Sequence, residues 1–226
     1  PYTLLIMLSS YQVCRRLVMP ASFLLVLFYA IYLVVRNGVI SYQKASGLVM
    51  FSGIVLFCFY SFIRLKELLP VETYGYDAVF FILLILCFAW GGDTCAYFAG
   101  RAFGKHKLCP VVSPKKTVEG AIGGVLGTMV FGVIVTLIYS VAADRMEAFT
   151  RSNIGVSMYV IIALLACIAA VLGIYGDLFA SVVKRQCGIK DYGTIFPGHG
   201  GILDRFDSVM FIAPFVTMVI IAVFYH

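Results

Sequence analysis

Four aspartates near the ends of long apolar runs are the residues best suited to chemistry in this chain. They are Asp93, Asp177, Asp204 and Asp207, and the last two are three residues apart, hence on one face if helical. A carboxylate within a membrane span is costly, and such residues tend to face the bundle interior and mark substrate or ion sites. Mg²⁺ takes oxygen ligands, commonly one or two carboxylates plus substrate phosphates, and Asp177 and Asp204 fit that role.

A plainer explanation exists for single members of this set. For Asp93 or Asp207, helix capping or an ion pair with a nearby base is about as good an explanation as catalysis. The candidate bases are Arg101, Lys184, Arg185 and Arg205. The combination of four acids is harder to explain in this way, and it favours a site.

Two polar residues follow Asp177 at helical spacing. Ser181 is four residues further on and Lys184 seven, so the three share one helix face. That face would present a metal ligand, a hydroxyl and a cation. A lysine at a helix end also reaches toward water without any function, so the spacing alone is weak evidence.

Two loops could bind phosphate. The glycine-rich stretch 197–201 (PGHGG) offers unhindered backbone N–H groups, although a plain turn explains it equally. Ser113 and Pro114 suit the N-cap and first position of a helix that would continue into run 121–143. Lys115 and Lys116 would then strengthen an anion site at the helix N-terminus, or simply mark the cytoplasmic side.

The elements that must position these residues are membrane-spanning helices. The chain has 226 residues, of which 62% are hydrophobic and 12% charged, far from the soluble balance of about a quarter charged. A span needs roughly 20 apolar residues. We therefore predict an all-α, polytopic transmembrane helical bundle of about six to seven spans. A shorter apolar run covers 1–13, and the six full runs are 17–35, 46–63, 78–99, 121–143, 154–183 and 208–225.

Charge bias orients this bundle. Alternating spans put loops 36–45, 100–120 and 184–207 on one side, with loops 64–77 and 144–153 on the other. The first side carries most of the Lys and Arg residues, so it is predicted to be cytoplasmic, and all four aspartates reach that side. The seven cysteines form no CxxC pair and are interpreted as small buried hydrophobes.

The stretch 181–207 resembles the signature of phosphatidate cytidylyltransferases, also called CDP-diacylglycerol synthases. That signature runs Ser-x-x-Lys-Arg, Lys-Asp, a small residue, His-Gly-Gly, Asp-Arg and a final Asp. The matching positions are Ser181, Lys184, Arg185, Lys190, Asp191, Gly193, His199, Gly200, Gly201, Asp204, Arg205 and Asp207. Upstream, 93–97, 100–107 and 113–117 are similar to that family's middle region, so the resemblance spans roughly 78–226.

The resemblance implies a multi-pass enzyme of the bacterial-type cytoplasmic membrane, often dimeric, with its active site facing the cytoplasm. Its substrates would be CTP and phosphatidate, its surroundings membrane lipids, and it would have no nucleic-acid partner. Asp177 and Asp204 would hold Mg²⁺, with K⁺ as a second metal, and Asp207 and Lys184 would complete the catalytic set. The implied substrate contacts are Ser181, Arg185, Lys190, Asp191, His199, Gly200, Gly201, Arg205, Asp93, Lys115 and Lys116.

Two regions follow from these patterns. Residues 1–77 are predicted to be N-terminal transmembrane helices whose native start lies upstream of Pro1, and 78–226 the catalytic transmembrane region with loops 100–120 and 184–207. One alternative is a CTP-dependent enzyme or kinase acting on another lipid. Another is an ion-coupled transporter, with Asp93 and Asp177 at a broken helix. It expects a midplane site and a repeat relating the two halves, and the sequence indicates neither.

Overall fold

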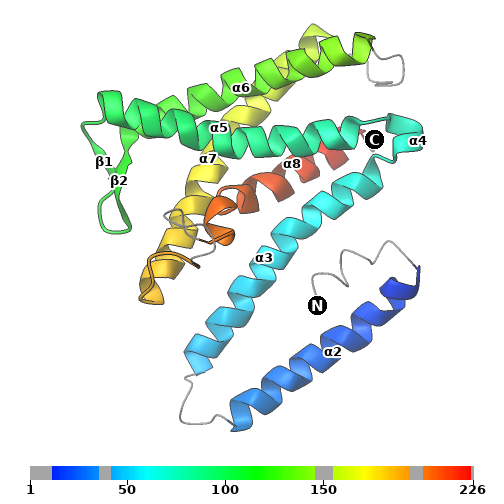
Figure 1. Cartoon of the computed structure of the whole chain (residues 1–226), viewed down its shortest axis with the longest axis vertical. Coiled ribbons are helices and arrows are strands. Elements are labelled where there is room, and N and C mark those ends of the chain that lie inside the picture. Colours follow the sequence, from blue (N-terminus) through cyan, green and yellow to red (C-terminus); the bar gives the residue numbers. More distant parts are fainter. Residues whose placement is uncertain (1–11, 36–41, 146–154, 194–200, 225–226) are drawn as a thin grey trace. The chain divides into compact units, whose positions relative to one another are not determined.

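The computed structural model describes residues 12–35, 42–145, 155–193 and 201–224, which are mostly helical (Figure 1). Contacts along the chain divide it into two units, Pro1–Glu67 and Leu68–His226. The first unit contains α2 (Gln12–Val35) and nearly all of α3 (Tyr42–Leu68). Every residue of the candidate site belongs to the second unit.

The second unit is built from helices and one small hairpin. Its α-helices are α4 (Val71–Tyr74), α5 (Asp77–Phe103), α6 (Val118–Arg145), α7 (Val156–Gln186) and α8 (Val209–Phe224). A 3-10 turn, η2 (Leu203–Arg205), precedes α8, and strands β1 (Lys107–Cys109) and β2 (Ser113–Thr117) form an antiparallel pair between α5 and α6.

The six predicted apolar runs all coincide with helices. Four helical segments are long and apolar enough to cross a membrane, and α8 contains a shorter apolar stretch, Val209–Ala222. The structure therefore supports a polytopic membrane protein, with four candidate spans counted over the described residues. The candidate spans are Ser46–Leu68, Asp77–Phe103, Val118–Ala142 and Val156–Gln186. Most of run 1–13 lies outside the described residues.

The all-α prediction is wrong between α5 and α6, where the chain forms the β1–β2 hairpin. Residues 113–117 pair with 107–109 instead of starting a helix, with Lys107 opposite Thr117. The helix begins four residues later than predicted, at Val118, because Thr117 supplies the cap. Its Oγ1 accepts the Gly120 N–H at 3.1 Å, a bond typical of an N-cap residue and the third residue of the helix.

Close packing of α5 against α6 depends on glycine. A Cβ added to Gly123 would lie 2.2 Å from Ala99 Cβ, and one added to Gly127 would lie 2.3 Å from Cys95 Cβ. Because these distances are far below van der Waals contact, only glycine permits this approach. The helix α5 also contacts α7 and α8 and buries Phe88, so the helix that carries Asp93 is packed against three other helices.

Glycines also bring α7 against the start of α8. A Cβ on Gly176 would meet the Asp207 carbonyl oxygen at 2.7 Å, and one on Gly173 would meet Ile212 Cδ1 at 2.9 Å. The backbone before α8 therefore lies directly on α7, one residue from Asp177.

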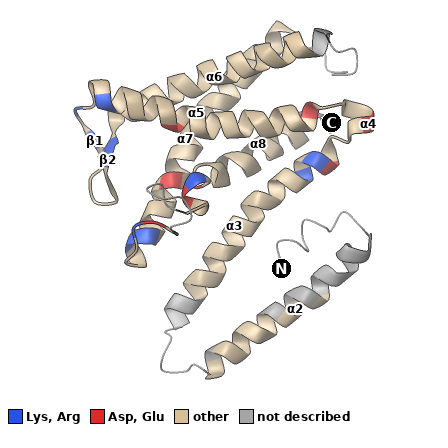
Figure 2. Cartoon of the chain, viewed as in Figure 1, with Lys and Arg blue, Asp and Glu red and all other residues tan. Residues whose placement is uncertain are grey.

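Charged residues of the second unit lie at the hairpin, at the end of α7 and in the segment before α8, with further acids at α4 and the start of α5, while most helical residues are uncharged (Figure 2). The cysteines whose side chains are described are all free thiols, as predicted. The prediction that they are buried holds for Cys58, whereas Cys87, Cys95, Cys109 and Cys167 are half-buried and Cys187 is exposed beyond the end of α7.

Candidate active site

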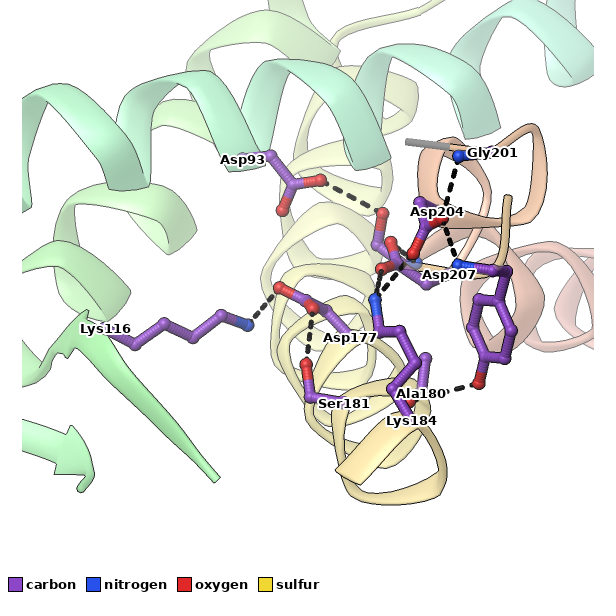
Figure 3. Close-up of polar contacts among 11 residues, drawn as sticks. Asp93, Lys116, Asp177, Ala180, Ser181, Lys184, Gly201, Asp204 and Asp207 are labelled. Carbon is purple, nitrogen blue, oxygen red and sulfur yellow. Dashed lines mark hydrogen bonds and ion pairs between the residues drawn. The ribbon is translucent and has the colours of Figure 1, made fainter. Parts of the chain in front are cut away.

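All four aspartates line one cavity of about 370 Å³ in the second unit. Asp93 comes from α5, Asp177 from α7, and Asp204 and Asp207 from the segment before α8. Lys116 of β2 lines the same cavity from the opposite side (Figure 3). The four aspartates, predicted to reach one side of the bundle, thus come together in one cavity.

Asp204 is held by three donors. Lys184 Nζ lies 2.8 Å from Oδ1, and Oδ2 accepts the backbone N–H groups of Tyr192 at 2.8 Å and Gly201 at 2.9 Å (Figure 3). Burial by itself raises the pKa of Asp204, but the bonds from Lys184 and the two N–H groups outweigh it and hold the pKa below its ordinary value. Asp204 is therefore a fixed anion.

Asp177 has fewer partners, and one of them comes from the hairpin. Lys116 Nζ forms an ion pair with Asp177 Oδ2, and the Ser181 hydroxyl donates to Oδ1 at 3.4 Å. The side chains of Asp177 and Lys116 are each about a quarter exposed, at 24% and 25%. The predicted shared face of Asp177, Ser181 and Lys184 is confirmed, since all three reach this one cluster.

Asp93 and Asp207 are joined through Ser208. The Ser208 hydroxyl donates to Asp93 Oδ2 at 3.1 Å, and its backbone N–H donates to Asp207 Oδ1 at 2.9 Å. Asp207 also lies 4.0 Å from Lys184 Nζ, so the ion pair considered as its plain explanation exists. Burial, followed by the charge of Asp177, raises the pKa of Asp207 to about 7.

The donor set of the cavity suits a hard divalent cation. Four carboxylates face two lysines, Lys116 and Lys184, which leaves an excess of negative charge when all four are ionised. Within the described part of the chain, no three Asp, Glu, His or Cys side chains are grouped closely enough to hold a metal by themselves. Mg²⁺ fits this arrangement because it usually keeps several waters and binds one or two carboxylates plus substrate phosphates.

The structure separates some residues that the sequence had grouped. Lys115 and Lys116 are neighbours on β2 and therefore point to opposite faces, so Lys115 is exposed while Lys116 reaches the cavity. Arg185, Lys190 and Asp191 are exposed at and beyond the end of α7.

The other predicted contacts fall in three places. Gly201 is buried and donates to Asp204. Arg205 lines a second cavity of about 640 Å³, which includes Asp204 and Asp93 as well. The predicted contacts His199 and Gly200 lie outside the described residues.

The sequence interpretation missed Trp90, the single tryptophan of the chain. Its Nε1–H donates to the Arg205 carbonyl at 3.0 Å, and its ring meets Phe206 edge-on at 5.8 Å between centroids. Trp90 therefore ties the segment carrying Asp204 to α5. A tryptophan near the end of an apolar run, three residues before Asp93, was the available signal, because such residues collect at membrane interfaces.

Comparison with known proteins adds an independent observation. The model of the cytidylyltransferase family matches residues 1–223. A phosphatidate cytidylyltransferase of Bacillus subtilis (strain 168) is 34% identical over 191 residues, which cover 84% of this chain and 64% of the relative. That of Staphylococcus haemolyticus (strain JCSC1435) is 40% identical over 145 residues, covering 64% of this chain and 50% of the relative.

A third relative gives the same result. The phosphatidate cytidylyltransferase of Staphylococcus saprophyticus is 41% identical over 147 residues, covering 65% of this chain and 51% of the relative. The chain thus spans between half and two thirds of the length of these three relatives.

Proposed function

This chain belongs to the cytidylyltransferase family, and from that premise we propose that it transfers CMP from CTP to phosphatidate, giving CDP-diacylglycerol and pyrophosphate. Relatives that bear the name phosphatidate cytidylyltransferase support this proposal. The observation that carries it is the cavity in which Asp177, Asp204, Lys116 and Lys184 meet at the ends of apolar helices.

In the proposed reaction, a phosphate oxygen of phosphatidate attacks the α-phosphorus of CTP. A new P–O bond forms to that phosphorus, the bond to the bridging oxygen of the β-phosphate breaks, and pyrophosphate leaves with that electron pair. Because the phosphate of phosphatidate is already anionic, the chain has no need to supply a strong base. Its task is to align two anionic substrates and offset their charge.

Asp177 and Asp204 are the residues proposed to hold Mg²⁺, with K⁺ as a second metal. When bound, Mg²⁺ supplies charge neutralisation and orientation of the nucleotide phosphates. Asp204 would present a carboxylate whose direction is already fixed by the two N–H groups of Tyr192 and Gly201. Asp207 would support this pair as a third acid, and Asp93 would lie beside the substrates.

The basic residues have the complementary task. Lys116 and Lys184 would meet phosphate oxygens of the substrates, and the pairing of each lysine with one of these carboxylates supports that role. Ser181 adds a hydroxyl beside Asp177. The other proposed substrate contacts are Arg185, Lys190, Asp191, Lys115, Arg205, His199, Gly200 and Gly201.

The position of the site at the ends of apolar helices fits a lipid substrate. The acyl tails would stay in the bilayer while the phosphate reaches the cavity, and the charge bias of the loops favours a cytoplasmic orientation. We propose a homodimer in the bacterial cytoplasmic membrane, because the family resemblance implies both.

The direct test uses purified protein in detergent with CTP, Mg²⁺ and phosphatidate, and measures CDP-diacylglycerol and pyrophosphate together. Equal amounts of both products are expected, with none when EDTA replaces Mg²⁺. A panel of other lipid phosphates and of diacylglycerol identifies the acceptor. Turnover of CTP with a different lipid only would overturn the choice of phosphatidate, and no turnover with any lipid would overturn the proposed function.

A further inference from the structure

The β1–β2 hairpin carries one side of the site. Lys116 of β2 pairs with Asp177 of α7, and Leu108 and Thr117 line the same cavity. A two-stranded hairpin is marginally stable by itself. The position of Lys116 therefore depends on what fastens the hairpin to the helices.

The carboxylate of Glu119 makes that attachment. It accepts the backbone N–H of Lys105 at 3.0 Å and that of His106 at 3.2 Å, and His106 Nδ1 lies 2.6 Å from Oε1. A further backbone bond runs from the Val118 N–H to the His106 carbonyl at 2.9 Å. Glu119 is in the first turn of α6, where a negative charge is favourable, so one side chain joins the start of α6 to the chain entering β1.

Packing beneath this attachment leaves little room for movement. A Cβ on Gly104 would lie 2.8 Å from Thr117 Cγ2, and one on Gly100 would lie 2.8 Å from Thr117 Oγ1. The last turn of α5 thus rests directly on the residue that ends β2 and caps α6. These contacts fix Thr117 at the end of the hairpin, and Lys116 is the residue immediately before it.

We propose that Glu119 is a positioning residue which, with His106, holds the hairpin so that Lys116 reaches Asp177 and the phosphates of the substrate. Glu119 does not line the cavity and so acts through Lys116. The catalytic part of this inference rests on the proposed function, whereas the attachment of the hairpin can be tested without turnover.

The test compares Glu119→Ala, Glu119→Gln and Lys116→Ala with the parent. The rate of hydrogen exchange at the amides of residues 107–117 measures how stably the hairpin is held, and kcat/KM for CTP measures the activity of the site. With Glu119→Ala, we expect hairpin amides to exchange about tenfold faster and kcat/KM to fall roughly tenfold or more. Whichever of kcat and KM changes in Lys116→Ala should also change in Glu119→Ala, because both substitutions act through Lys116.

The conservative variant Glu119→Gln separates loss of these hydrogen bonds from a general loss of folding. In Glu119→Gln the amide oxygen still accepts backbone N–H groups and the amide N–H can face His106, so activity within about threefold of the parent is expected. Glu72→Ala removes an exposed acid from the first turn of α4 and should change neither readout. If Glu119→Ala does not fold, His106→Ala replaces it, with a smaller change in the same direction.

Three results would overturn the inference. They are hairpin exchange that is unchanged in Glu119→Ala, loss of activity without faster hairpin exchange, and a Glu119→Gln variant as impaired as Glu119→Ala. An inactive parent protein would instead count against the proposed function, and the exchange data would still decide whether Glu119 fastens the hairpin.

Discussion

Asp204 and Asp177 line the same cavity, but the chain holds them differently. Asp204 is 9% exposed and fixed by Lys184 and two backbone N–H groups of its own neighbourhood. Asp177 is 24% exposed, and its cation comes from the hairpin on the other side of the cavity. The orientation of Asp204 is thus fixed by two backbone N–H groups as well as by a cation, whereas Asp177 depends on a lysine from the hairpin and one hydroxyl.

The largest effect is expected from Asp204→Asn. The amide has one acceptor oxygen where the carboxylate has two, and Lys184 loses its nearer anion and keeps only Asp207, at 4.0 Å, in a nearly buried place. We expect product formation to fall by at least about 1000-fold and the free energy of unfolding to fall by roughly 3 kcal/mol. Radiolabelled CTP turnover and thermal melting in detergent measure the two effects. A stable Asp204→Asn protein would mean that the three donors do not fix this segment.

Asp177→Asn should lose activity to a similar extent while keeping its stability. Its ion pair is partly exposed, and such pairs contribute only about 0–1 kcal/mol, so the melting temperature should stay close to that of the parent. The same two assays apply, with Glu72→Gln as a control for loss of one acidic charge. A near-normal rate at any Mg²⁺ concentration would remove Asp177 from the metal site, and a large drop in melting temperature would remove the contrast with Asp204.

Gly176→Ala tests the backbone contact that brings Asp177 of α7 close to Asp207. Its Cβ would meet the Asp207 carbonyl at 2.7 Å, and backbone cannot give way as a flexible side chain can. We expect a loss of about 1–3 kcal/mol and a lower kcat, because the start of α8 must move away from α7. Gly53→Ala is the matched control, since nothing lies within 4 Å of its added Cβ. Equal behaviour of the two variants would contradict this packing argument.

Asp207→Asn should change stability by an amount that depends on pH. The folded pKa of Asp207 is raised to about 7, first by burial and then by Asp177, from about 3.9 in an unfolded chain. The folded form binds the extra proton, so Asp207 costs stability as pH rises between these values. In EDTA, the variant should melt above the parent at pH 8, with a smaller difference at pH 5. A gain that does not depend on pH would show that Asp207 keeps an ordinary pKa.

Much of the helical architecture follows from sequence alone. Each of the six full apolar runs coincides with a helix in the described part of the chain, because about 20 consecutive apolar residues leave few other ways to satisfy the backbone in a bilayer. The meeting of Asp93 and Asp177 was also predictable, since both lie near the C-terminal ends of apolar runs that were predicted to run in the same direction.

The hairpin could not be predicted from the same rules. Ser113 and Pro114 suit a helix start, yet Thr117 provides the cap that is used, and Thr117 followed by the acid Glu119 was an overlooked signal. Strand pairing then sends Lys115 and Lys116 to opposite faces, a difference that adjacent lysines in a sequence do not reveal.

The sequence by itself determined a helical membrane protein with acids and bases at one end of its spans, because hydropathy and charge act locally along the chain. Only the tertiary structure decided which cation meets which carboxylate. Lys184 pairs with Asp204 twenty residues away and Lys116 with Asp177 from another element. Those pairings depend on how closely α5, α6, α7 and α8 approach, which glycine contacts across the helices set and no local pattern encodes.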